Sequence, residues 1–314
     1  MRTAKKLTTV AAALALTTLA AGCGDDGGSG GSGSGDRLDG VSLTVGSKDF
    51  TENILVGEML VQALEAEGAS VTNQTNLGGT SVAREALLAG EINVYPEYNG
   101  TGWTVHLGNE DPSQDPEELF NVTSEQDLAD NNIAWVGRSP FNDTYGFAAN
   151  GDLWESDGPF DLQGMADYLE ANPDTTVCME TEFPDRPDGL VLFEDATGYE
   201  VPNSQIQILE TGLIYTETDA GNCDFGEVFT TDGRIGALNM ELVEDPGVFI
   251  LYNLSFTFEG DVYDENAEVY DEIAEAIFEP LDEERMAELN GQVDLDGTPV
   301  ERVAEEYLSE IGLV

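Results

Sequence analysis

The chain has 314 residues, of which 40% are hydrophobic, enough to bury the cores of about two domains of ordinary size. Its 63 acidic residues against 11 basic ones give a formal net charge of −52, which excludes nucleic acids and anionic membrane surfaces as electrostatic partners. We interpret this acidity as an adaptation to a saline habitat, where salt screens the repulsion between carboxylates. Acidic extracytoplasmic proteins of other habitats are the alternative.

The first 22 residues have the features of an export signal. Three basic residues precede an apolar stretch that is too short to span a membrane in the mature protein. The stretch ends in Ala-Ala-Gly-Cys, which resembles the lipobox of bacterial lipoproteins. We predict a signal peptide over 1–22, a lipid attached to Cys23, and a Gly/Ser-rich tether over 23–40. The alternative is a simple secretory peptide followed by a disordered tail.

The two remaining cysteines, Cys178 and Cys223, are predicted to form one disulfide bond. An even number of cysteines outside the cytosol is typical of such a bond. Two free thiols and a metal site are the alternatives, and neither cysteine has a second Cys or a His at the spacing of metal ligands.

From Val41 onward, short apolar runs alternate with helical periodicity, which predicts an α/β fold. We expect Thr51 to cap the first helix, and a glycine turn at 77–81 to present free amide groups to a cleft. The predicted strands are 43–45, 71–75, 92–95, 135–136, 145–148, 177–179, 205–209 and 249–258. The predicted helices are 51–67, 82–89, 162–171, 267–278, 283–289 and 300–311.

The residue inventory argues against catalysis. His106 is the only histidine, and no nucleophile motif accompanies it. Carboxylate pairs of the glycosidase type are expected by chance among 63 acidic residues. Asp294 and Asp296 suggest a calcium loop, but a full EF-hand register would place Gln292 and Val303 at ligand positions. We therefore predict no catalytic residue, no metal and no cofactor.

Aromatic and basic residues near the ends of predicted strands indicate ligand capture instead. Tyr95 and Tyr98 follow one strand and Lys48 follows another, and the C-terminal ends of parallel strands border ligand crevices. Lys48 is the only lysine after the first six residues. Arg186 has two interpretations, a ligand contact and a salt bridge to one of the many acidic residues.

Five motifs occur in the order 47–52 (SKDFTE), 76–80 (NLGGT), 95–102 (YPEYNGTG), 141–145 (FNDTY) and 230–235 (TTDGRI). Together they resemble segments of the substrate-binding proteins of glycine betaine/choline-type ABC transporters. The likeness extends from about Val41 to the C-terminus.

This resemblance implies a two-lobed periplasmic-binding-protein fold of type II, with the ligand cleft between the lobes and two chain crossovers. Lobe 1 would comprise 41–142 and 249–314, and the inserted lobe 2 would comprise 147–244. The hinge crossings would be 143–146 and 245–248.

The resemblance also implies an aromatic cage for a quaternary ammonium group, which cannot donate a hydrogen bond and is bound by ring faces. The cage positions fall on Tyr98, Tyr145 and Tyr252. Phe229 is the fourth wall, at a place where many relatives have Tyr.

The family's carboxylate-binding positions fall on Lys48, Thr101 and Arg186. A guanidinium, an ammonium and a hydroxyl can all bind a carboxylate, so this set favours a zwitterionic betaine over choline. Tyr199 and Tyr215 lie outside the matched motifs, and we interpret them as packing residues.

These inferences predict a non-enzymatic, extracytoplasmic receptor that captures glycine betaine or a related quaternary ammonium osmolyte and delivers it to an ABC importer. The expected partner is a permease coupled to a cytoplasmic ATPase. The receptor would be a monomer that contacts the cell membrane only through its N-terminal lipid and binds no nucleic acid. The alternatives are a receptor of the same fold for choline or carnitine, and an extracellular carboxylate-dependent hydrolase.

Overall fold

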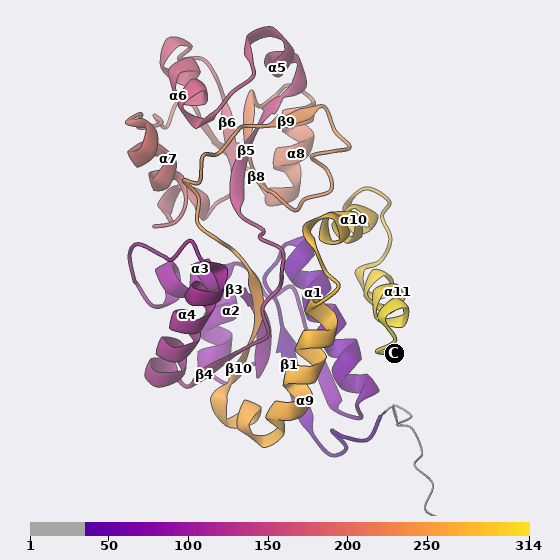
Figure 1. The fold of residues 1–314 in the computed structure, drawn as a ribbon. Coiled ribbons are helices and arrows are strands. Elements are labelled where there is room, and N and C mark those ends of the chain that lie inside the picture. Colours follow the sequence, from indigo (N-terminus) through magenta and orange to yellow (C-terminus); the bar gives the residue numbers. More distant parts are fainter. Residues whose placement is uncertain (1–34) are drawn as a thin grey trace, which may run out of the picture. The chain divides into compact units, whose positions relative to one another are not determined.

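Residues 35–314 are described by the computed structural model, and they form two five-stranded sheets with helices around each (Figure 1). The predicted signal peptide, Cys23 and most of the predicted tether lie outside the described residues. Within this range, no helix combines the length and the apolar character needed to cross a bilayer.

The first sheet has the strand order β2-β1-β3-β10-β4. β1 pairs in parallel with β2 and β3, whereas β10 lies antiparallel between β3 and β4. Helix α1 packs with α9, α10 and α11, while α2 contacts β3 and β10. The strands are β1 (Ser42–Gly46), β2 (Ser70–Gln74), β3 (Val94–Tyr98), β4 (Ile133–Val136) and β10 (Leu254–Glu259). The helices are α1 (Thr51–Ala66), α2 (Thr80–Leu88), α3 (Asn99–Thr101), the π-helix η1 (Gly102–His106), α4 (Pro116–Asn131), α9 (Gly260–Phe278), α10 (Glu283–Asp294) and α11 (Val300–Ile311).

The second sheet has the order β7-β6-β8-β5-β9 and the same mixture of parallel and antiparallel pairs. Its strands are β5 (Tyr145–Asn150), β6 (Val177–Met179), β7 (Ile206–Ile208), β8 (Phe225–Phe229) and β9 (Met240–Leu242). The helices are α5 (Gly151–Asp157), α6 (Leu162–Ala171), the 3-10 turn η2 (Phe183–Asp185), α7 (Leu190–Thr197) and α8 (Thr211–Asp219). The α/β fold predicted from the sequence is therefore confirmed, in a two-lobed form.

The chain passes between the two sheets twice, from β4 to β5 and from β9 to β10 (Figure 1). The two connections lie side by side and bond to each other. The Thr144 hydroxyl donates to the Ile250 carbonyl at 2.8 Å, and the Tyr252 amide donates to the Asn142 side chain at 2.6 Å. The end of the first connection and the segment that precedes β10 are thereby held together between the lobes.

The predicted disulfide is present. Cys178 of β6 and Cys223, which precedes β8, are bonded, with their Cα atoms 5.8 Å apart and both side chains fully buried. Because β6 and β8 are neighbouring strands, the bond closes a loop of 45 residues within the second lobe.

Some predicted elements differ from the structure. Phe50, not Thr51, occupies the N-cap position of α1, and the Thr51 hydroxyl donates to Asp294 at 2.7 Å instead. The first half of the predicted strand 249–258 belongs to the second connection, because β10 begins only at Leu254. Helix α4 was not predicted, since its few buried side chains include polar residues and give no apolar periodicity.

Candidate ligand-binding site

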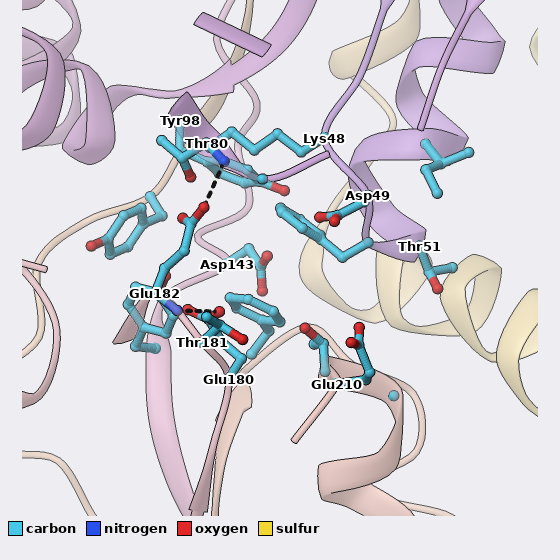
Figure 2. A pocket seen from close by; sticks show the side chains of 18 of the residues that line it. Lys48, Asp49, Thr51, Thr80, Tyr98, Asp143, Glu180, Thr181, Glu182 and Glu210 are labelled. Atoms are coloured by element: carbon cyan, nitrogen blue, oxygen red, sulfur yellow. Dashed lines mark hydrogen bonds between the residues drawn. The ribbon is translucent and has the colours of Figure 1, made fainter. Parts of the chain in front are cut away.

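A cavity of about 550 Å³ lies between the two lobes, and side chains of both lobes line it (Figure 2). This volume is within the range of small-molecule pockets. All seven residues predicted to bind the ligand line it: Lys48, Tyr98, Thr101, Tyr145, Arg186, Phe229 and Tyr252. The structure thus brings together residues that are up to about two hundred positions apart in the sequence.

The cavity wall is built from strand ends and from the connections between the lobes. Tyr98 is the last residue of β3, and Tyr145 and Phe229 face each other as paired residues at the ends of β5 and β8. Tyr252 lies in the second connection. The expectation that Tyr98 follows its strand is wrong by a few residues, because β3 extends to include it.

Five aromatic rings form a closed circuit around the cavity: Phe50, Tyr98, Tyr252, Tyr145 and Phe229. Neighbouring ring centroids are 5.2–6.2 Å apart along the whole circuit. The rings of Tyr98, Phe50, Phe229 and Tyr145 are inclined to their neighbours by only 24–32°, whereas Tyr252 stands nearly edge-on to Tyr98 and Tyr145. Five aromatic rings are therefore available to a cation in this cavity.

Phe50 is an aromatic residue of the cavity lining that sequence reasoning missed. Its ring lies between Tyr98, at 6.0 Å, and Phe229, at 5.2 Å, and is stacked on both. A signal was present, since Phe50 stands inside the SKDFTE motif between Lys48 and Glu52.

Lys48 reaches the cavity with its charge already paired. Its Nζ lies 2.6 Å from Oε1 of Glu97, and both side chains are buried. Burial alone would raise the pKa of Glu97, but Lys48 and His106 together hold the pKa well below its usual range. His106 binds the other oxygen of Glu97 at 2.8 Å, and burial lowers the pKa of His106 itself. The single histidine therefore supports the carboxylate that holds Lys48.

Arg186 is engaged in the same way. Its Nε and Nη2 donate to Asp188 at 2.8 Å each, and it also donates to the hydroxyls of Thr80 and Thr101 at 3.1 Å. These two threonines belong to the other lobe, so Arg186 bridges the cleft. The salt-bridge interpretation of Arg186 is confirmed by its pairing with Asp188. Arg186 also lines the cavity, and its contact with a ligand stays a prediction.

The predicted glycine turn does present an amide to the cleft. The Thr80 N–H donates to Oε1 of Glu182 at 3.0 Å, across the lobes, as Figure 2 shows. A Cβ on Gly79 would lie 2.1 Å from that same oxygen, so a side chain at this position would displace the Glu182 carboxylate from this bond.

The cavity wall carries more acidic than basic groups. Its cations are Lys48, Arg186 and Arg234, and its acids are Asp49, Asp143, Glu180, Glu182, Glu210 and Asp294. Arg234 is bonded to Asp232 at 2.9 Å and lies 3.3 Å from Asp294. The balance favours a ligand that carries a positive charge.

The two tyrosines interpreted as packing residues lie outside the cavity lining. Tyr199 donates to Gln205 at 2.6 Å. Tyr215 is fully buried under the guanidinium of Arg234, and its hydroxyl accepts the Phe229 amide at 3.0 Å. Tyr215 thus holds Phe229, a residue of the cavity lining, in place from behind. In the described part of the chain, no group of three or more His, Cys, Asp or Glu is placed to hold a metal.

Comparisons with known proteins agree with this geometry. A family model described as the substrate binding domain of ABC-type glycine betaine transport systems matches residues 41–310. The chain is 28% identical to the glycine betaine-binding protein YehZ of Escherichia coli K12, over 86% of this chain and 90% of YehZ. It is 29% identical to a glycine-betaine-binding protein of Pseudomonas aeruginosa PAO1, over 86% of this chain and 88% of that protein. The apo structure of YehZ is similar with a TM-score of 0.62 at 27% identity, covering 87% of this chain and 99% of that structure.

Proposed function

Because the chain belongs to the family of substrate-binding domains of ABC-type glycine betaine transport systems, we propose that its five-ring cage captures glycine betaine or a related quaternary ammonium osmolyte. Members of this family are extracytoplasmic, non-enzymatic binding proteins of ABC importers. The observation that carries the proposal is the closed circuit of rings around a cavity with a net acidic wall. A quaternary ammonium needs ring faces and negative charge, and this site offers both.

We assign the ligand's carboxylate to Lys48, Thr101 and Arg186. All five N–H groups of Arg186 donate to acceptors of the protein in this structure. The carboxylate of the ligand therefore has to replace one of these acceptors. If the carboxylate displaces the hydroxyl of Thr80 or Thr101 from Arg186, a charged acceptor takes the place of a neutral one. Hydrogen bonds to a charged acceptor are about twice as strong as those between neutral groups. This exchange supports a betaine over choline, because choline has no carboxylate to make it.

The mechanism is a closure of the two lobes on the ligand. The lobes are assigned to 41–142 with 249–314 and to 147–244, with hinges at 143–146 and 245–248. Closure excludes water, which strengthens both the cation–π contacts and the charged hydrogen bonds. The receptor, a monomer tethered through a lipid on Cys23, then docks on a permease coupled to a cytoplasmic ATPase.

Calorimetric titration in high salt tests the proposal, with glycine betaine, proline betaine, choline and carnitine compared side by side. We expect both betaines to bind tightly and choline to bind at least about tenfold more weakly. Equal binding of choline would retain the cage but remove the carboxylate assignment. Absence of binding by all four ligands would refute the proposed function and leave a hydrolase to be tested.

A further inference from the structure

Two buried carboxyl groups meet directly behind the cage. Glu52 comes from α1 in the first lobe, and Asp143 comes from the connection between the lobes. Each is only 4% exposed, and Asp143 also lines the ligand cavity (Figure 2). The hydroxyl of Thr231 joins them, since its Oγ1 lies 2.7 Å from Oε2 of Glu52 and 2.5 Å from Oδ1 of Asp143.

Counting hydrogens shows that one of the two carboxyls is protonated. The Thr231 hydroxyl has one hydrogen and can donate it to only one of its two neighbours. If both carboxyls were ionised, the remaining contact would place two oxygen lone pairs against each other at hydrogen-bond distance. The contact is satisfied if one carboxyl donates to Thr231 and Thr231 donates to the other.

The donors around the pair decide which carboxyl keeps the negative charge. Besides Thr231, Glu52 accepts the hydroxyl of Tyr98 at 2.9 Å and the side-chain amide of Asn290 at 3.2 Å. Asp143 accepts only one further, longer bond, from the Thr231 amide at 3.3 Å. Burial raises the pKa of Glu52, and burial followed by the charge of Glu52 raises the pKa of Asp143 well above its usual value. The proton therefore belongs to Asp143 and the charge to Glu52.

No resident cation neutralises this charge among the residues that the structure describes. Neither Glu52 nor Asp143 takes part in an ion pair within residues 35–314. The loop after β8 brings Asp232 and Arg234 to a small cavity that the pair also lines, but Arg234 is already bonded to Asp232 and close to Asp294. Two buried carboxyls without a cation are costly, which is typical of a site that awaits one.

The following inference rests on the proposed function. We propose that the Glu52–Asp143 pair holds one proton and one negative charge, and that this charge is the counter-ion of the quaternary ammonium in the cage. Tyr98 connects the two features, because its ring is a cage wall and its hydroxyl donates to Glu52. Glu52 is then a specificity-determining residue, which favours a permanent cation over a neutral group of the same shape, and Asp143 is a positioning residue that holds the shared proton.

The test compares glycine betaine with 3,3-dimethylbutanoate, in which a carbon replaces the quaternary nitrogen, by calorimetry at pH 7.5 in high salt. In Glu52→Gln we expect betaine affinity to fall at least about tenfold, with little change for the isostere. Asp143→Asn mimics a carboxyl that is already protonated, so we expect a loss of no more than about threefold. Asp130→Asn, an exposed position on α4, is the matched control and should change neither affinity.

Equal losses for betaine and its isostere in Glu52→Gln would show a structural effect and overturn the proposal, as would an equally large loss in Asp143→Asn. A second measurement compares the pH profiles of wild type and Glu52→Gln. Betaine affinity of the wild type should fall when acid protonates Glu52 and the counter-charge is lost, and Glu52→Gln should lack this fall. The same pH profile in both proteins would also overturn the proposal. If wild type binds no quaternary ammonium, the proposed function itself fails, which is a separate result.

Discussion

Replacing Tyr145 by leucine should weaken ligand binding without dismantling the second lobe. Tyr145 is 6% exposed, and its ring contacts Phe183, Phe229 and Tyr252 at centroid distances of 4.9–5.4 Å. Leucine retains much of the apolar volume, so the expected cost in folding free energy is about 1–3 kcal/mol. It removes one of the five ring faces.

The loss of affinity follows from the environment of that ring. A cation–π contact contributes about 0.5 kcal/mol at an exposed site and about 2 kcal/mol when it is desolvated. The burial of Tyr145 places it in the upper half of this range, which corresponds to binding weakened about 10- to 30-fold. Tyr145→Phe keeps the ring and its three neighbours, and we expect its affinity to stay within about threefold of wild type.

Calorimetric titration with glycine betaine provides the measurement, after circular dichroism has established that each variant is folded. Tyr199→Leu is the control, since Tyr199 belongs to the same lobe but lies outside the cavity lining. If Tyr145→Leu is folded and binds within twofold of wild type, the ring does not contribute to capture and the reasoning is refuted.

Three further predictions concern stability. Replacing Cys178 and Cys223 together by serine should lower the free energy of unfolding by about 4 kcal/mol, because the disulfide no longer restricts the unfolded chain over a loop of this length. Urea denaturation measures this loss, and a loss below about 1 kcal/mol would contradict the prediction. Asp127→Ala leaves the guanidinium of Arg84 buried without its carboxylate, so we expect the free energy of unfolding to fall by about 3–5 kcal/mol in the same assay. An unchanged free energy of unfolding would show that the ion pair is dispensable. Burial and Glu180 raise the pKa of Glu227 to about 8 from an ordinary value of 4.5, so the folded state binds more protons than the unfolded one and stability falls as pH rises between these values. Glu227→Gln removes this titrating group, so the Tm of the variant minus the Tm of wild type should increase as the pH rises from 4.5 to about 8. A difference in Tm that stays constant with pH would count against the raised pKa of Glu227.

The elements that could be predicted from sequence are those whose signal is local. Helix α6 has the predicted bounds, because Leu162, Met165, Ala166 and Leu169 are buried at helical spacing. Helix α4 has no such pattern, since its few buried residues include Asp127, which pairs with Arg84 of α2 and accepts a hydrogen bond from Trp135. That pairing depends on a contact between residues 43 positions apart, which periodicity cannot reveal.

The same limit applies to the site. The motifs contain four of the seven residues predicted to bind the ligand, Lys48, Tyr98, Thr101 and Tyr145, because each motif is contiguous in sequence. They did not identify Glu97 and Asp188 as the partners of Lys48 and Arg186, since any of the 63 acidic residues is an equally good candidate before the fold is known. Lys48 and Arg186 are each paired with a carboxylate of the protein, so neither depends on the ligand for a counter-charge.

Titration with a methylation series tests the central claim most directly. Glycine, N-methylglycine, N,N-dimethylglycine and glycine betaine carry the same carboxylate and the same charge, and differ only in how many N–H groups the ammonium keeps. A cage of ring faces offers those N–H groups poor acceptors and rewards each added methyl group. We therefore expect affinity to rise at every step and to be at least about a hundredfold higher for glycine betaine than for glycine. Equal affinities across the series would contradict the aromatic cage as the recognition element.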